Sequence, residues 1–139
     1  MQVHEMERAV IQWQKRVNHP FSFRPRTVDM KEAELQAALL TEEGITEYLR
    51  AVKHGDLVEI ADALGDALWI VLRGFAIHGM DVESVFNAIA ASNYSKFDAK
   101  GKPVPHPTIP GKIGKSDRFT PPTEDLTTYI RRALEMRVS

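Results

Sequence analysis

Five carboxylates stand at helical spacing on two consecutive segments of this chain. Glu43 and Glu47 are four residues apart, so a helix would carry both on one face. Glu59, Asp62 and Asp66 follow at positions i, i+3 and i+7, which again share one helix face. Carboxylates offer oxygen donors alone, and Mg²⁺ and Mn²⁺ prefer oxygen. The pattern predicts a divalent-metal site between two helices.

The segment that carries the second group of acids is otherwise almost entirely apolar. Residues 60–72 read IADALGDALWIVL, so we expect this helix to be mostly buried. Buried carboxylates repel one another and lose their hydration, so Glu59 and Asp62 would need cations beside them. This surrounding is the reason to interpret the two acids as metal ligands.

Each acidic group also has an ordinary structural interpretation. Glu43 and Glu47 fit equally well as surface charges on an amphipathic helix. Asp66 is either a further ligand or a salt-bridge partner for Arg73 or Lys96. Residue chemistry alone leaves these alternatives open.

Polar residues near the end of a later apolar helix form a second candidate group. Asn93 and Lys96 are three residues apart, so an amide and an ammonium would share one face and could hold a base or sugar and a phosphate. An ordinary helix end, with a lysine near the negative end of the dipole, explains the pair equally well.

Further candidates lie in a long loop and in two tryptophans. The loop carries a third group of cations: Lys100, Lys102, Lys112, Lys115 and Arg118. Mobile lysines among glycines bind phosphate well, although scattered loop lysines are usually only solvated. Trp13 and Trp69 can stack on a base, but a tryptophan at helical apolar spacing is more often part of a core.

Hydrophobic periodicity predicts the helices that must position these residues. They cover about residues 3–18, 29–53, 56–78, 81–97 and 124–136. Asp29 and Glu32 have capping-box spacing, and a tight turn is expected at residues 54–56. Gly44 is a fault in the second helix or marks a local irregularity beside the acids. The fold class is all-α, with no strand pattern.

Length, charge and composition narrow the class of protein. We expect one domain over residues 1–139, with a helical core at about 3–97 and a basic loop and tail at 98–139. The net charge of −1 argues against binding of polymeric nucleic acid or a membrane surface. There is no cysteine, no signal-peptide pattern and no membrane-spanning run. A cytoplasmic protein is the expectation.

Several motifs occur in the order of a known superfamily. Its pattern is a helix with E-E-x-x-E, a turn, and a helix with E-x-x-D. Residues 55–81, GDLVEIADALGDALWIVLRGFAIHGMD, match the second half, and 92–104, SNYSKFDAKGKPV, match a later segment of the MazG-like branch. Over roughly residues 5–125 the chain resembles the all-α nucleoside triphosphate pyrophosphohydrolases, which include MazG, dimeric dUTPases and phosphoribosyl-ATP pyrophosphohydrolase.

One position departs from the superfamily pattern. Counting back from Glu59, Glu47 is the last glutamate of E-E-x-x-E and Glu43 the first. Gly44 then stands at the middle glutamate, and Glu42 is an acid one residue too early. Glu42 would point about 100° away on a regular helix unless Gly44 distorts it. This departure puts the number of metal ions and the catalytic rate in question.

The resemblance implies a four-helix bundle that forms homodimers or homotetramers, and a Mg²⁺-dependent enzyme, with Mn²⁺ as a substitute. It would cleave a nucleoside triphosphate, NTP or dNTP, to the monophosphate and pyrophosphate. The implied metal ligands are Glu43, Glu47, Glu59 and Asp62. Glu43 and Glu47 are the catalytic candidates, with Glu43 orienting or deprotonating the attacking water. Asn93, Lys96 and Lys112 would contact the nucleotide, with Glu42, Asp66 and Trp13 in support.

Two alternatives to the enzyme remain at this point. The departure at Gly44 favours a catalytically weakened relative that binds a nucleotide as a regulatory module. The other alternative is a structural helical oligomer whose acids merely bind cations. Pyrophosphate release and nucleotide-dependent stabilisation distinguish the three.

Overall fold

The computed structural model describes residues 1–136, and these residues are helical apart from their connections. The elements are α1 (Val3–Arg16), α2 (Met30–Thr41), the π-turn η1 (Glu42–Thr46), α3 (Glu47–His54), α4 (Leu57–His78), α5 (Val82–Tyr94) and α6 (Thr123–Glu135). Within this range the sole extended pairing is an isolated bridge between Pro105 and Ile113, so no strand is present. The all-α prediction is confirmed.

The backbone groups into two compact units. One covers Met1–Val82 and the other starts at Glu83 and is described to residue 136. None of the helices in the described range is long and apolar enough to cross a membrane. That the chain acts as a single domain stays a prediction.

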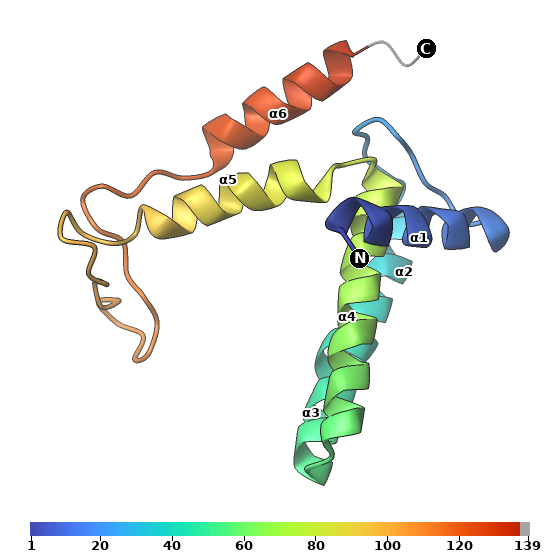
Figure 1. Cartoon of the computed structure of the whole chain (residues 1–139), viewed down its shortest axis with the longest axis horizontal. Coiled ribbons are helices and arrows are strands. Elements are labelled where there is room, and N and C mark those ends of the chain that lie inside the picture. Colours follow the sequence, from blue (N-terminus) through green and yellow to red (C-terminus); the bar gives the residue numbers. More distant parts are fainter. Residues whose placement is uncertain (137–139) are drawn as a thin grey trace. The chain divides into compact units, whose positions relative to one another are not determined.

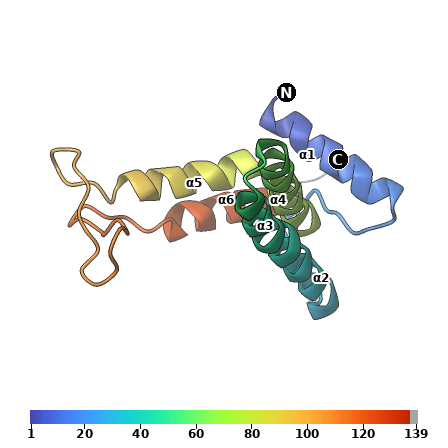
Figure 2. The same cartoon turned by 90° about the horizontal axis from the view of Figure 1, so that it is seen from below.

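A helical hairpin dominates the N-terminal unit. α2, η1 and α3 follow one another as one rod beside α4 (Figures 1 and 2). The Asp29 carboxylate caps the rod by accepting the Glu32 amide at 2.8 Å. At the tip, Gly55 has φ 69°, a left-handed conformation that glycine adopts without strain. Asp56 then starts α4 by accepting the Val58 amide at 2.8 Å.

The core of this unit lies where α1 packs against α4. Val10 of α1 is buried together with Leu72 and Ala76 of α4. Trp13 and Trp69 meet edge to face beside it, with ring centroids 6.1 Å apart. The apolar periodicity of both segments is therefore used for packing, and it holds α4 in place for the hairpin.

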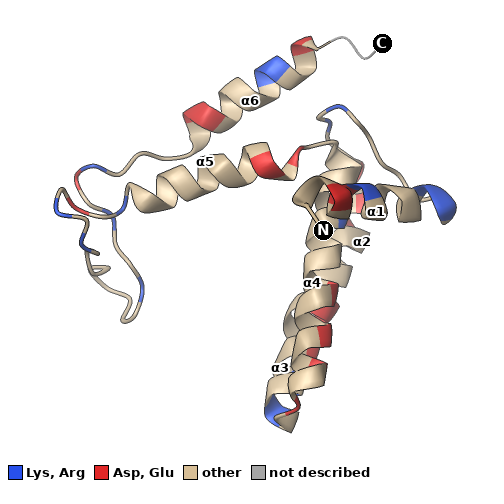
Figure 3. Ribbon diagram, in the orientation of Figure 1, with Lys and Arg blue, Asp and Glu red and all other residues tan. Residues whose placement is uncertain are grey.

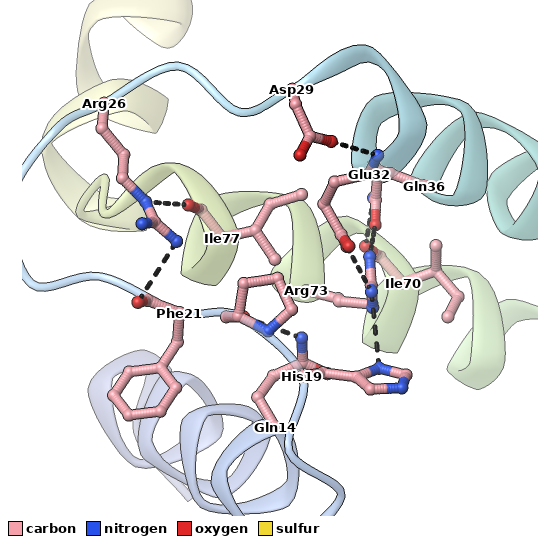
Figure 4. A network of polar contacts seen from close by, with 11 residues as sticks. Gln14, His19, Phe21, Arg26, Asp29, Glu32, Gln36, Ile70, Arg73 and Ile77 are labelled. Carbon is pink, nitrogen blue, oxygen red and sulfur yellow. Dashed lines mark hydrogen bonds and ion pairs between the residues drawn. The ribbon is translucent and has the colours of Figure 1, made fainter.

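A buried arginine joins α4 to α2 (Figure 4). Arg73 is only 3% exposed, and it donates to Glu32 at 2.6 Å and to Gln36 at 2.8 Å. Gln36 in turn donates to the Ile70 carbonyl at 2.8 Å, and His19 lies 3.5 Å from the guanidinium. Because Glu32 bonds Arg73, the capping box predicted at the start of α2 is only half formed.

The connector between α1 and α2 wraps the C-terminal end of α4. Ser22 donates its amide to the Ala76 carbonyl, and Arg26 donates its amide to the His78 carbonyl, both at 2.9 Å. Gly79 ends α4 at φ 66°, and a Cβ there would clash with the Arg24 carbonyl. This position needs glycine both for its backbone angle and for the close approach.

The N-terminal half of α4 is much more exposed than its sequence predicts. Leu57, Val58 and Leu64 are 81%, 78% and 54% exposed in the chain. The expectation of a mostly buried helix is wrong for this half, because a hairpin of two helices covers just one stripe of each. The buried positions of α4 concentrate instead towards Ile77.

The C-terminal unit contains α5, α6 and the long loop between them. A turn at residues 98–102 opens the loop, where Asp98 accepts two backbone amides at 2.9 Å. The isolated bridge then joins the two ends of residues 105–113. The Gly114 amide supports it by donating to the Val104 carbonyl at 2.6 Å. The loop predicted after residue 97 is thus held by its own hydrogen bonds.

Candidate functional site

The acidic residues gather on the hairpin, as the red segments of α4 in Figure 3 show. Glu43 lies at the centre of the group. Its pKa is raised above 4.5, first because burial penalises the charged form, and then because of Asp66, Glu47, Asp62 and Glu42. Acids from both helices of the hairpin therefore interact electrostatically in the structure.

The helix that carries Glu43 contains one extra residue in its turn. The Glu47 amide donates to the carbonyl of Glu42, five residues back, whereas an α-helix bonds four residues back. Glu47 therefore stands one full turn beyond Glu42. Gly44 lies within this turn, where an added Cβ would come 3.3 Å from Leu40 and 3.9 Å from Ala67. The irregularity expected at Gly44 is a π-turn.

Glu59 stands apart from the other acids. Its carboxylate lies 2.8 Å from Nδ1 of His54, and about half of each side chain is exposed. Glu59 is not among the charges that raise the pKa of Glu43, whereas Asp66 is the strongest of them. The sequence paired Glu59 with Asp62 as metal ligands, but in the chain they have different neighbours. His54 and Glu59 lie on opposite sides of the turn between α3 and α4, so spacing within one helix could not predict that they pair.

The acids carry no compensating charge from the core of the hairpin. The salt bridge considered between Asp66 and Arg73 is not formed, because Arg73 pairs with Glu32. Among residues 1–136 no three acids or histidines lie close enough, as they stand, to enclose a metal ion. The donor chemistry nevertheless fits Mg²⁺ or Mn²⁺, since it is oxygen alone, and a cation would relieve the repulsion around Glu43.

The residues predicted to contact a nucleotide belong to the C-terminal unit. Asn93 is exposed near the end of α5, and Lys112 is exposed in the loop. Lys96 is half-buried, and its carbonyl accepts the Ser116 amide at 3.1 Å. Trp13, the supporting candidate in the N-terminal unit, keeps 51% of its surface exposed, so part of its ring is free for stacking.

A comparison with protein families identifies the family of the chain. The family model of phosphoribosyl-ATP pyrophosphohydrolase matches residues 3–93, which include every acid of the hairpin. The chain belongs to the phosphoribosyl-ATP pyrophosphohydrolase family. Its members are hydrolases that act on phosphoric anhydrides, and the chain is accordingly a pyrophosphohydrolase of this class. No curated protein matches the chain.

The electrostatics of Glu43 give new weight to two residues that the sequence marked only as supporting candidates. Asp66 has the largest electrostatic effect on Glu43, and Glu42 is part of the same group. The sequence did contain a signal for Glu42, because this acid lies one residue too early for the E-E-x-x-E pattern. The hydrogen-bonding of the π-turn, which the sequence does not reveal, sets the position of Glu42 relative to Glu47.

Proposed function

We propose that this member of the phosphoribosyl-ATP pyrophosphohydrolase family is a Mg²⁺-dependent hydrolase of nucleoside triphosphates. It would cleave an NTP, a dNTP or a phosphoribosyl derivative of ATP to the monophosphate and pyrophosphate. The observation that carries the proposal is the group of carboxylates around Glu43, which raise its pKa and have no cation from the core beside them.

The π-turn supports a revised assignment of the acidic motif. Glu47 stands one turn beyond Glu42, as the last glutamate of E-E-x-x-E stands beyond the first. Glu42 and Glu43 are then the first two glutamates of the motif, and Gly44 is an inserted residue, not a replacement for the middle glutamate. The assignment keeps all three glutamates of the motif.

The residues that would hold Mg²⁺ come from both helices: Glu42, Glu43, Glu47, Asp62 and Asp66, with Glu59 available once it leaves His54. When bound, the metal supplies charge neutralisation for the phosphates and a lower pKa for water. Glu43 is the proposed base, because a raised pKa makes a carboxylate a better proton acceptor near neutral pH. It accepts a proton from the water whose oxygen attacks phosphorus, and the bond from phosphorus to pyrophosphate breaks.

Residues of the C-terminal unit would contact the nucleotide itself. Asn93 offers an amide to a base or sugar, and Lys96 and Lys112 offer ammonium groups to phosphates. Their exposure or partial exposure leaves these groups accessible to a ligand.

The active form is proposed to be a homodimer or homotetramer. Leu49 of α3 is 61% exposed, and exposed leucines also line the N-terminal half of α4. A second copy of the hairpin would cover these side chains and convert the exposed stripe into core.

Pyrophosphate release tests the proposal directly. The purified chain is assayed with the common NTPs and dNTPs and with phosphoribosyl-ATP, in Mg²⁺, Mn²⁺ or EDTA. Turnover is expected only when Mg²⁺ or Mn²⁺ is present. Glu43→Gln should lower kcat by about 100-fold or more. Glu34→Gln, an exposed acid on α2, is the matched control and should not change kcat. Absence of turnover with every substrate contradicts the proposal.

A nucleotide-binding module without catalysis is the second candidate. Two observations favour it: the pairing of Glu59 with His54, and the lack of a metal-ready group in the described part of the chain. This candidate predicts that nucleotides raise the Tm while no pyrophosphate appears. The same substrate panel, read by thermal unfolding, separates it from the enzyme.

A further inference from the structure

A hollow of about 490 Å³ lies in the C-terminal unit, between the end of α5 and the loop that follows it. Its lining includes Tyr94, Ser95, Phe97, Asp98, Arg118 and Thr120. None of these residues belongs to the acidic group of the hairpin. The volume lies in the range of small-molecule sites, which is about 300–1,000 Å³.

Hydrogen bonds within the unit fix the wall of the hollow. The Ser95 hydroxyl donates to the Ser92 carbonyl at 2.6 Å and accepts the Thr120 amide at 2.8 Å. Ser116 closes the link by donating its hydroxyl to the Ser95 carbonyl at 3.0 Å. Two segments more than twenty residues apart are thereby held together, so the hollow is pre-formed.

The charges of the lining favour an anion. The Asp98 carboxylate is engaged by the amides of Lys100 and Lys102, each at 2.9 Å, in a turn that Gly101 completes at φ 75°. The Arg118 guanidinium has no hydrogen-bond or ion-pair partner among the described residues. Arginine pairs well with the planar oxygens of phosphate.

The surrounding loop adds to this positive field. Residues 96–118 contain six lysines and arginines against two aspartates, whereas the whole chain has a net charge of −1. The rest of the chain is therefore acidic. Such an asymmetry attracts anionic ligands to the loop.

An aromatic surface lies on the same wall. Tyr94 is 73% exposed, and its ring packs edge to face with Phe97, with centroids 5.9 Å apart. The contact holds the tyrosine while leaving much of its ring exposed. Nucleotide bases stack favourably on exposed aromatic side chains.

We propose that this hollow is a nucleotide-binding site, with a phosphate at Arg118 and the base stacked on Tyr94. A guanidinium and an exposed ring in one hollow match a ligand that is both anionic and aromatic. The choice of a nucleotide within that class rests on the proposed function. The site needs no metal, because its own cation faces the phosphate.

Titration of AMP into the full chain in EDTA tests the site, since AMP has no anhydride to cleave. Calorimetry should detect binding, and Arg118→Gln should weaken it by about 10-fold or more. Tyr94→Leu should weaken it by about 5-fold or more. Arg131→Gln, an exposed arginine of α6 outside the hollow, is the control and should leave the Kd unchanged. The affinity for inorganic phosphate should fall in the Arg118→Gln variant and stay unchanged in the Tyr94→Leu variant.

The site is overturned if AMP does not bind, or if the Arg118→Gln and Tyr94→Leu variants bind AMP with the same Kd as the natural chain. Circular dichroism and the Arg118→Lys variant, which keeps the charge, guard against misfolding. Glu43→Gln should lose turnover yet keep its AMP affinity, so the two proposals fail separately. Competition by AMP against hydrolysis would identify the ligand as the substrate itself. Inhibition or activation without competition would identify a second nucleotide.

Discussion

The two halves of α4 differ in how their charged side chains are compensated. Towards the C-terminal end, Arg73 is buried and pairs with Glu32 and Gln36. In the N-terminal half, Asp62 and Asp66 add negative charge around Glu43, and the core supplies no cation beside them. One half satisfies its charge internally and stabilises the hairpin. The other leaves its charge without a partner from the core.

Solvent explains why the acidic half is tolerated. Asp62 is exposed and Asp66 is only half-buried, so water reaches the acidic face of the helix. Hydration lowers the cost of like charges, which would be prohibitive in a dry core. The raised pKa of Glu43 is the remaining sign of repulsion.

The largest expected effect tests the buried half. Arg73→Ala leaves Glu32 without its partner and should lower the free energy of unfolding by about 3–5 kcal/mol. Arg50→Ala, an exposed arginine on α3, should change it by less than about 0.5 kcal/mol. Urea denaturation of both variants measures the difference. Equal stabilities of the two variants would show that the Arg73–Glu32 pair does not stabilise the hairpin.

Removal of an acid from the N-terminal half of α4 should not lower the free energy of unfolding. Asp66→Asn removes the strongest repulsion on Glu43, so without Mg²⁺ it should leave stability unchanged or raise it by about 0.5 kcal/mol. The same variant should lose most of the rise in Tm that Mg²⁺ gives the natural chain. Thermal unfolding with and without Mg²⁺ measures both effects. A loss of stability in EDTA would mean that Asp66 serves the fold.

The pH dependence gives a smaller effect. A carboxyl with a raised pKa in the folded state contributes stability below its unfolded pKa, and that contribution is lost as the pH rises through the folded pKa. Glu43→Gln lacks this titration. Its Tm relative to the natural chain should therefore increase as the pH rises from about 4.5, when both are measured in EDTA. If this difference in Tm stayed constant or fell with pH, the claim that neighbouring acids repel Glu43 would be contradicted.

Much of this fold can be predicted from local sequence signals. The cap at Asp29, the turn at Gly55 and the end of α4 at Gly79 lie where the sequence places them, because each depends on a few adjacent residues. Burial is different. The exposure of Leu57 and Leu64 depends on what covers the hairpin, and periodicity identifies an apolar stripe without identifying its partner.

The site is predictable to a similar degree. Spacing brought Glu43, Glu47, Asp62 and Asp66 together, since i, i+3 and i+4 positions share a face. The pairing of Glu59 crosses between helices, so no spacing rule within a helix contains it. Nor did the regular α-helical rule predict the π-turn, because it assumes 3.6 residues per turn.

The turnover of two Gly44 variants tests the central claim, that the π-turn restores the acidic motif around an inserted residue. Deleting Gly44 leaves E-E-x-x-E on a regular helix, so Mg²⁺-dependent pyrophosphate release should stay within about threefold of the natural chain. Deleting Ala37 of α2, where no π-turn absorbs the change, should abolish it. Gly44→Glu, which would restore the motif if Gly44 replaced the middle glutamate, should give no gain. Loss of activity on deleting Gly44, with a gain in Gly44→Glu, would contradict the account.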